Sequence, residues 1–352
     1  MDNTTTFTDF TNWTTNGPCD VDTHPNIRLA FISFGTVISM MGCGFNLLLL
    51  FIFLSRSSNN PFQTFLAFLD FMLCFLFITC FGALTISVTF RIEWLYITMK
   101  TYNVHMLIAS RIVQLCIPYI LIANTAFRLA CITERTVPQI RGRNLQLTVV
   151  IITAIVAFLR LPGYFFIEVV ILPNCDLFQS RILSGKEFIH LFLSFVILCV
   201  LNCIVVQKLR SSHRRAMKQS AFPKIMHATR GNDAEQEERR EYKRLRCAVK
   251  TTIVIISSYL ACNSVNFVLY CIEIFKSNLT QDEDGNFNVF YVIASDLGTN
   301  LFVFSSTIRI FVYYKYNPTI RQQIQSVTNP RCLIGNKETY HRKHKALNAS
   351  SI

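Results

Sequence analysis

The stretch NTAFRLACITERTVPQI, residues 124–140, places one arginine inside an apolar segment and a Glu-Arg pair where that segment ends. Arg128 lies in the apolar part, and Glu134 and Arg135 follow about two helical turns later, just before a proline-containing segment. Counting back from Arg128, residues at intervals of three or four share one face of a helix, and most of them are polar or are proline: Asn124 or Thr125, Leu121, Pro118 and Gln114. A polar face on an apolar helix points into a bundle, which predicts a central helix here.

The composition indicates a membrane protein. The chain has 352 residues, of which 51% are hydrophobic and only 16% are charged, whereas a soluble domain carries about 25% charged residues. Its apolar residues gather in runs that are long enough to cross a bilayer, and a backbone exposed to lipid must satisfy its own hydrogen bonds, which favours helices. We count seven such runs, at about residues 29–54, 65–90, 104–132, 145–172, 188–206, 249–275 and 289–314.

The sequence therefore predicts an all-α membrane protein with a seven-helix bundle. Residues 1–28 form a tail, residues 29–316 form the transmembrane domain, and residues 317–352 form a short amphipathic helix and a second tail. The first 26 residues are polar and lack a signal-peptide pattern, so we expect the first run to insert as a signal-anchor.

Basic residues and glycosylation sequons predict the orientation. Most of the 34 Lys and Arg residues fall in the loops and the tail that lie on one side of such a bundle, and basic residues favour the cytoplasmic side. Three sequons lie on the other side and are candidate glycosylation sites, at Asn3, Asn12 and Asn278. We therefore expect a plasma-membrane protein with an extracellular N-terminus.

Ionisable residues inside the runs are costly in lipid and mark functional sites by default. Asp70, Arg128 and Arg309 lie well inside the second, third and seventh runs. One acid and two bases at similar depth predict a paired cluster. This cluster either stabilises the packing between helices or acts as a conformational switch. Uncharged amides in the runs add to this polar core, among them Asn46, Asn124 and Asn263.

These residues resemble the rhodopsin-like G-protein-coupled receptors along residues 29–332. The segment GCGFNLLLLFIFLSR resembles that family's first helix, with Asn46 as its asparagine, and LAFLD, ending at Asp70, resembles its second. ERT, starting at Glu134, resembles the switch at the end of helix three. RIFVY, residues 309–313, stands where the family has Asn-Pro-x-x-Tyr, with Tyr313 as its tyrosine, and NPTIRQQI resembles the short helix that follows.

The sequence departs from this pattern at several positions. Helix six reads YLACNSVNF, with Asn263 and Val265 where the family has tryptophan and proline. The prolines of helices five and seven are missing, and Ser110 stands at the usual helix-three cysteine. Such erosion is similar to invertebrate, nematode-like receptors for FMRFamide-type neuropeptides.

The resemblance implies roles for the polar residues. Arg135 pairs with Glu134 at rest and on activation meets the C-terminal helix of a Gα subunit. The helix-two acid of the family holds sodium with partners on helices three and seven, and the matching positions here are Asp70, Asn124, Ser305 and Arg309. Since Arg309 brings its own tethered charge, we predict an Asp70–Arg309 ion pair in place of sodium. Arg309 turning to water or to Glu134 is the alternative, and Arg128 is a rival for the same carboxylate.

Further candidates concern the ligand pocket and covalent modification. Gln114 and Pro118 on the inward face, with Glu273 and Asp296 near the outer ends of helices six and seven, are candidate pocket residues; the two acids are alternatively solvated rim charges. Cys19 and Cys175 lie outside, where oxidising surroundings favour pairing, so Cys175 either bonds Cys19 or is free. Cys332 is a palmitoylation candidate and is otherwise unmodified.

The favoured function is a receptor that binds an extracellular peptide and activates a heterotrimeric G protein. A chemosensory small-molecule receptor of the same fold is one alternative, and a small transporter or channel subunit is another. The sequence shows no internal repeat that would favour a transporter. It also shows no nucleotide loop, metal set or nucleophile constellation, so we expect no enzyme, no cofactor and no nucleic-acid partner.

Overall fold

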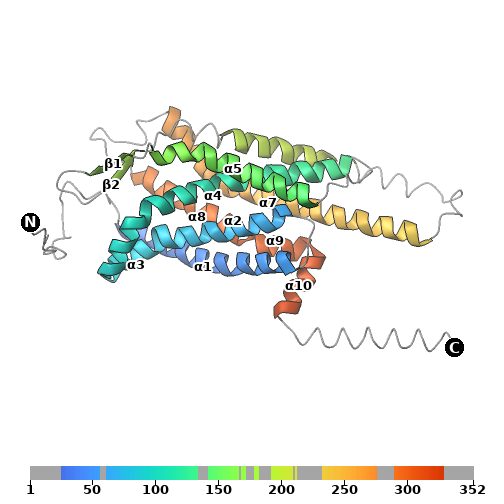
Figure 1. Ribbon diagram of the computed structural model, residues 1–352, viewed down its shortest axis with the longest axis horizontal. Helices are drawn as coiled ribbons and strands as arrows, with labels where there is room; N and C mark the ends of the chain where they lie inside the picture. The colour runs from blue at the N-terminus through green and yellow to red at the C-terminus, as the bar shows by residue number, and fades with distance from the viewer. Residues whose placement is uncertain are drawn as a thin grey trace, which may run out of the picture.

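The computed structural model describes residues 25–55, 61–133, 142–165, 168–171, 178–181, 192–208, 211, 232–275 and 289–328. Its helices run along one axis and form an elongated bundle (Figure 1). Among these residues, five helices are long and apolar enough to cross a membrane, and two shorter apolar helices, Asn144–Phe158 and Phe192–Lys208, accompany them. The seven correspond to the seven runs and confirm the predicted helical membrane bundle.

Most of the runs form one long helix each. These are α1 (Pro25–Ser55), α4 (Glu93–Thr133), α5 (Gly142–Phe165), the helix Phe192–Lys208, and α7 (Asn232–Phe275). The second run is continuous but contains one π-helical turn, and it is divided into α2 (Pro61–Phe77), η1 (Ile78–Gly82) and α3 (Ala83–Thr89). The seventh run is broken into α8 (Val289–Thr307) and α9 (Arg309–Tyr316). The predicted amphipathic helix follows as α10 (Pro318–Thr328).

A small hairpin replaces the predicted end of the fourth helix. The run was expected to continue to residue 172, but α5 ends at Phe165 and the strand β1 (Glu168–Ile171) pairs antiparallel with β2 (Phe178–Arg181). The segment EVVI is rich in β-branched residues, which favour a strand over a helix. Figure 1 shows this hairpin at one end of the bundle and α10 at the other, and these are called the hairpin end and the α10 end below.

Two helices begin earlier in the chain than the sequence predicts. α4 begins at Glu93, so most of the expected loop before the third run is helical, and the turn that precedes it uses Arg91 with a positive φ of 54°. α7 begins at Asn232 and projects past the other helices at the α10 end (Figure 1). Its first part is rich in Glu, Arg and Lys, which have high helix propensity. The predicted extension of the sixth helix is therefore present.

The core gathers around α4. Ile117, Ile120 and Leu121 are fully buried and belong to the main hydrophobic cluster together with Leu66 of α2 and Ile256 of α7. These α4 residues lie on or beside the face that the sequence marks as inward. The expectation of a central third helix is thus met by its packing.

Helices α1 and α8 are held together by polar contacts in addition to packing. The side chain of Asn300 donates to the backbone oxygen of Phe31 at 2.9 Å, and that of Thr307 donates to the oxygen of Ile38 at 3.4 Å. Gly35 of α1 makes this approach possible, since a Cβ there would lie 2.1 Å from Asn300 Oδ1. The contacts follow the same order along both helices, so α1 and α8 are parallel, as the first and seventh passes of a bundle must be.

Candidate functional site

The break in the seventh helix positions Arg309. The residues before the break carry hydroxyls that bond back to their own helix: Ser305 Oγ donates to Phe302 O at 2.8 Å, and Thr307 Oγ1 donates to Val303 O at 3.1 Å. Such back-bonding competes with the backbone ladder and bends helices. At Ile308 the helix tightens, since the amide of Phe311 donates to its oxygen at 3.1 Å over three residues. The helix therefore breaks without a proline.

The predicted ion pair forms in the interior of the bundle. Arg309 Nη1 donates to Asp70 Oδ2, which joins α9 to α2. Both side chains are only 1% exposed. Asp70 lies on the inward face of α2 among buried apolar residues, so the guanidinium supplies the charge that this carboxylate needs. Arg309, and not Arg128, takes this place.

Further polar groups from α1 and α8 surround the pair. Asn46 Nδ2 donates to the backbone oxygen of Ser306 at 3.4 Å, and both residues are at most 1% exposed. We call Asn46, Asp70, Ser306 and Arg309 the core polar cluster. Several of its buried atoms have no hydrogen-bond partner within the protein: Asn46 Oδ1, Asp70 Oδ1, Ser306 Oγ, Arg309 Nε and Arg309 Nη2. Burial of unpartnered polar groups is costly, so changes within the core polar cluster should have large effects on stability.

The two serines of the Ser-Ser pair before the break have different contacts. Ser305 was expected beside the acid, but its hydroxyl bonds within its own helix, and Ser306 lies next to Asn46. The two serines are adjacent, and a helix turns by about 100° per residue. Matching the sequence to a family motif cannot decide which of the two adjacent serines faces the acid, because the helix is also broken two residues later.

The remaining core candidates take other positions. Asn263 Nδ2 donates to Tyr259 O at 2.8 Å in its own helix, α7. Tyr313 is buried on α9 and packs edge-on against Phe53, with ring centroids 5.4 Å apart. Asn124 is 4% exposed, and its Oδ1 has no hydrogen-bond partner. Of the predicted core residues, Asn46, Asp70 and Arg309 lie in the core polar cluster, whereas the side chain of Asn263 forms its hydrogen bond within its own helix.

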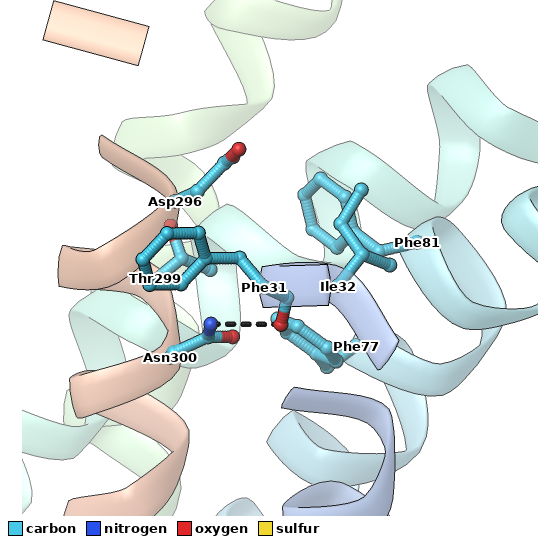
Figure 2. A pocket seen from close by; sticks show the side chains of 7 residues that line it. All are labelled: Phe31, Ile32, Phe77, Phe81, Asp296, Thr299 and Asn300. Atoms are coloured by element: carbon cyan, nitrogen blue, oxygen red, sulfur yellow. Dashed lines mark hydrogen bonds between the residues drawn. The ribbon is translucent and has the colours of Figure 1, made fainter. Parts of the chain in front are cut away.

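Three of the candidate pocket residues have described contacts within the bundle. Asp296 of α8 forms an ion pair with Arg28 of α1 at 3.3 Å and faces a cavity between α1, η1 and α8 (Figure 2). Gln114 donates to Ser110 Oγ at 3.3 Å on its own helix, and Pro118 is buried in α4. Neither of them lines this cavity. The pocket predicted for Gln114, Pro118, Glu273 and Asp296 stays a prediction, since the side chain of Glu273 lies outside the described residues.

Two arginines were missed by the sequence reasoning. Arg28 is the partner of Asp296, and Arg111 Nη1 donates to the hydroxyl of Tyr270 at 3.1 Å, which links α4 to α7. Arg111 lies three residues before Gln114 and so continues the inward face of the third run. That spacing was sufficient to predict that Arg111 lies on the inward face.

Several predicted positions lie outside the described residues or side chains. They are Glu134, Arg135, Cys19, Cys175, Asn3, Asn12, Asn278 and Cys332, together with the side chain of Glu273. Within the described part of the chain, no group of three or more His, Cys, Asp or Glu side chains is arranged to hold a metal ion.

Comparisons with known proteins identify the fold. No protein-family model matches the chain, and no curated protein matches it in sequence. Among solved structures, the crystal structure of squid rhodopsin is similar over 87% of this chain and 86% of that chain, with a TM-score of 0.62 and 17% sequence identity. The chain therefore has the fold of rhodopsin.

Proposed function

We propose that this protein is a G-protein-coupled receptor of the plasma membrane, which binds an extracellular ligand and activates a heterotrimeric G protein. The observation that carries the proposal is the combination of the rhodopsin fold with the buried Asp70–Arg309 pair. Within that fold, the pair joins the second and seventh helices at the positions whose motifs resemble the family. A receptor needs a bundle whose helices have two arrangements, and in this proposal the contact between α2 and α9 through Asp70 and Arg309 differs between the two.

The same pair argues against a transporter or channel subunit. A pore-lining acid faces a water-filled cavity or a substrate path. Asp70 and Arg309 are each 1% exposed and face each other. Flux of a charged substrate along these residues would require the core to open.

The hairpin end is the proposed extracellular face, and the α10 end is the proposed G-protein face. The projecting part of α7 and the amphipathic α10 lie at the same end (Figure 1), where basic residues concentrate in the sequence. Glu134 and Arg135 belong to this face in the proposal. The proposed ligand is a neuropeptide, and a small chemosensory ligand is the second candidate on the sequence pattern alone.

The test is ligand-stimulated nucleotide exchange on Gα, with the chain in lipid nanodiscs and a library of short amidated peptides as ligands. Arg135→Ala is expected to abolish exchange while surface expression and ligand binding persist. Arg141→Ala, a nearby basic residue that carries no proposed role, serves as the matched control. Exchange by Arg135→Ala at the wild-type rate contradicts its role. Substrate-driven flux in liposomes without nucleotide exchange would contradict the receptor function and favour a transporter function.

A further inference from the structure

The turn between α3 and α4 forms a corner at the hairpin end of the bundle (Figure 1). Arg91, in this turn, has a φ of 54°, a left-handed conformation that glycine adopts without steric cost and arginine rarely adopts. The amide of Ile92 donates to the backbone oxygen of Ser87 at 2.9 Å, so the chain turns back directly after α3. The corner is therefore a fixed turn, and its arginine stands where glycine would fit with less strain.

Large apolar side chains are exposed on both sides of this turn. Phe90 is 71% exposed, Trp94 is 69% exposed and Ile97 is 50% exposed. Trp94 and Ile97 lie three residues apart in α4, so they share one face of the helix. We call Phe90, Trp94 and Ile97 the corner patch. Exposed apolar side chains that gather in one place indicate an interaction surface.

The corner patch begins where a membrane span ends. The second run is apolar enough to cross a bilayer along Pro61–Thr89, whereas α4 is so only along His105–Ala130. By composition, the first turns of α4 would belong to an aqueous loop. Phe90 follows the second span directly, however, and the exposed side chains of Ile86 and Val88 lead up to it. The patch is thus continuous with the surface that α3 exposes to lipid.

The lengths of the helices keep the first turns of α4 near the end of that span. The rings of Phe62 in α2 and Phe127 in α4 lie 6.1 Å apart, so the two helices are level there. From this level α4 rises about 51 Å to its start at Glu93, whereas the second run rises about 41 Å to Thr89. The turn cannot take up the difference, because the amide of Ile92 is bonded back to α3. We infer that α4 is inclined to the second run, so its first turns do not project straight into water.

The polar groups beside the corner patch are compatible with a place in the membrane interface. Thr98 and Thr101 of α4 donate their hydroxyls to backbone oxygens of their own helix at 2.7 and 2.8 Å, and Thr89 of α3 does so at 2.8 Å. Hydroxyls bonded in this way need no water as a partner. Along α3 and the first two turns of α4, the sequence has only two charged residues, Arg91 and Glu93, and both lie at the turn.

We propose that the corner patch docks on the bilayer leaflet at the hairpin end, so that the first turns of α4 lie in the membrane interface and not in an aqueous loop. The partner is the phospholipid surface. The rings of Phe90 and Trp94 lie at the boundary between headgroups and acyl chains, where aromatic side chains are enriched in membrane proteins. Arg91 lies among the headgroups, where phosphate accepts hydrogen bonds from its guanidinium. This contact does not depend on the activation of a G protein.

The test uses the fact that the chain has two tryptophans. Trp13→Phe leaves Trp94 as the only tryptophan, and the full chain is placed in nanodiscs whose lipids are brominated either near the headgroup or near the chain end. The fluorescence of Trp94 is expected to fall by more than half with bromine near the headgroup, to fall less with bromine near the chain end, and to change little with aqueous iodide. Met40→Trp in a chain whose own tryptophans are both phenylalanine is the depth control. Met40 is exposed at the middle of α1, so this tryptophan should respond most to bromine near the chain end.

A second variant tests whether the patch holds the corner in the lipid. Phe90→Ser and Ile97→Ser, combined in the chain with Trp94 alone, remove two apolar members and keep the reporter. Both side chains are exposed, so the packing within the protein is preserved. Lipid quenching of Trp94 should decrease and iodide quenching should increase. Val150→Ser on α5 removes another exposed apolar side chain and should leave the quenching of Trp94 unchanged.

Three results would overturn the proposal. Quenching of Trp94 by iodide and not by brominated lipid would place the corner in water, as an ordinary loop. Quenching by neither agent would mean that the patch packs against protein, such as a second copy of this chain. Lipid quenching that is unchanged by Phe90→Ser with Ile97→Ser would show that the patch does not hold the corner in the leaflet.

Discussion

Replacing Asp70 by asparagine tests whether the core depends on its buried ion pair. The amide has nearly the same size but carries no charge, so Arg309 would remain as a cation that is 1% exposed. Two unit charges about 4 Å apart attract by about 4 kcal/mol at an effective dielectric of 20 before desolvation. Breaking one side of a buried pair costs about 3–5 kcal/mol, because the other charge is left uncompensated. Asp70→Asn should therefore be severe.

The expected loss can be measured by thermal unfolding of the purified chain with a thiol-reactive dye. Cys74 and Cys116 are 0% and 1% exposed, so their thiols become reactive only when the bundle opens. At about 2 °C per kcal/mol for a chain of this size class, the thermal midpoint should fall by roughly 6–10 °C. Asp296→Asn is the matched control, because its partner is partly exposed and such pairs contribute about 1 kcal/mol or less.

The double variant Asp70→Asn with Arg309→Gln tests whether the stability loss of Asp70→Asn comes from the unpaired charge or from the changed side-chain shape. It removes both charges, so it should recover much of the loss and be more stable than Asp70→Asn alone. Replacing a buried ion pair by neutral groups is often tolerated for this reason, and several atoms of this pair are unpartnered already. A double variant whose loss equals the sum of the two single losses would show that the residues do not interact, and the reasoning would fail.

Three further predictions follow from other contacts. Replacing sodium by N-methylglucamine should leave thermal stability and agonist affinity unchanged, because Arg309 already occupies the Asp70 carboxylate; a sodium-dependent shift in agonist affinity contradicts this. Gly35→Ala should destabilise the protein by about 1–3 kcal/mol, because the new Cβ would lie 2.1 Å from Asn300 Oδ1. As a control, Gly44→Ala meets nothing within 4 Å and should stabilise the protein by about 0.5–1 kcal/mol. If the unfolding midpoints of the two variants move in the same direction, the close approach at Gly35 is refuted. Asn317→Ala should cost about 1 kcal/mol, because Asn317 Oδ1 accepts the amides of Thr319 and Ile320 at the start of α10; hydrogen exchange of α10 amides that stays at the wild-type rate would contradict that role.

The apolar runs were sufficient to predict the bundle, and charged residues within them were sufficient to predict a buried cluster of Asp70, Arg128 and Arg309. A segment that crosses lipid must be apolar and hydrogen-bonded within itself, so length and hydropathy nearly determine the secondary structure. A charge in such a segment needs a partner, but the choice of Arg309 over Arg128 came from the resemblance to the rhodopsin-like receptors. Hydropathy was given more weight than the strand propensity of Glu168–Ile171, so this first strand of the hairpin was assigned to the fourth helix.

Other features depended on contacts between helices that are distant in sequence. Nothing in the third or seventh run indicates that Asp296 faces Arg28 of α1, or that Gln114 bonds within its own helix. Likewise, the break at Ile308 and the choice of Ser306 over Ser305 depend on how hydroxyls compete for backbone oxygens in a packed helix. Sequence periodicity assigns a residue to a face of its helix to within about one position, whereas partner choice depends on the rotation and depth of two helices relative to each other. The sequence by itself determined the bundle and its buried charges; only the tertiary structure decided which polar groups meet, because a hydrogen bond forms within about 3 Å and a helix places successive residues 100° apart.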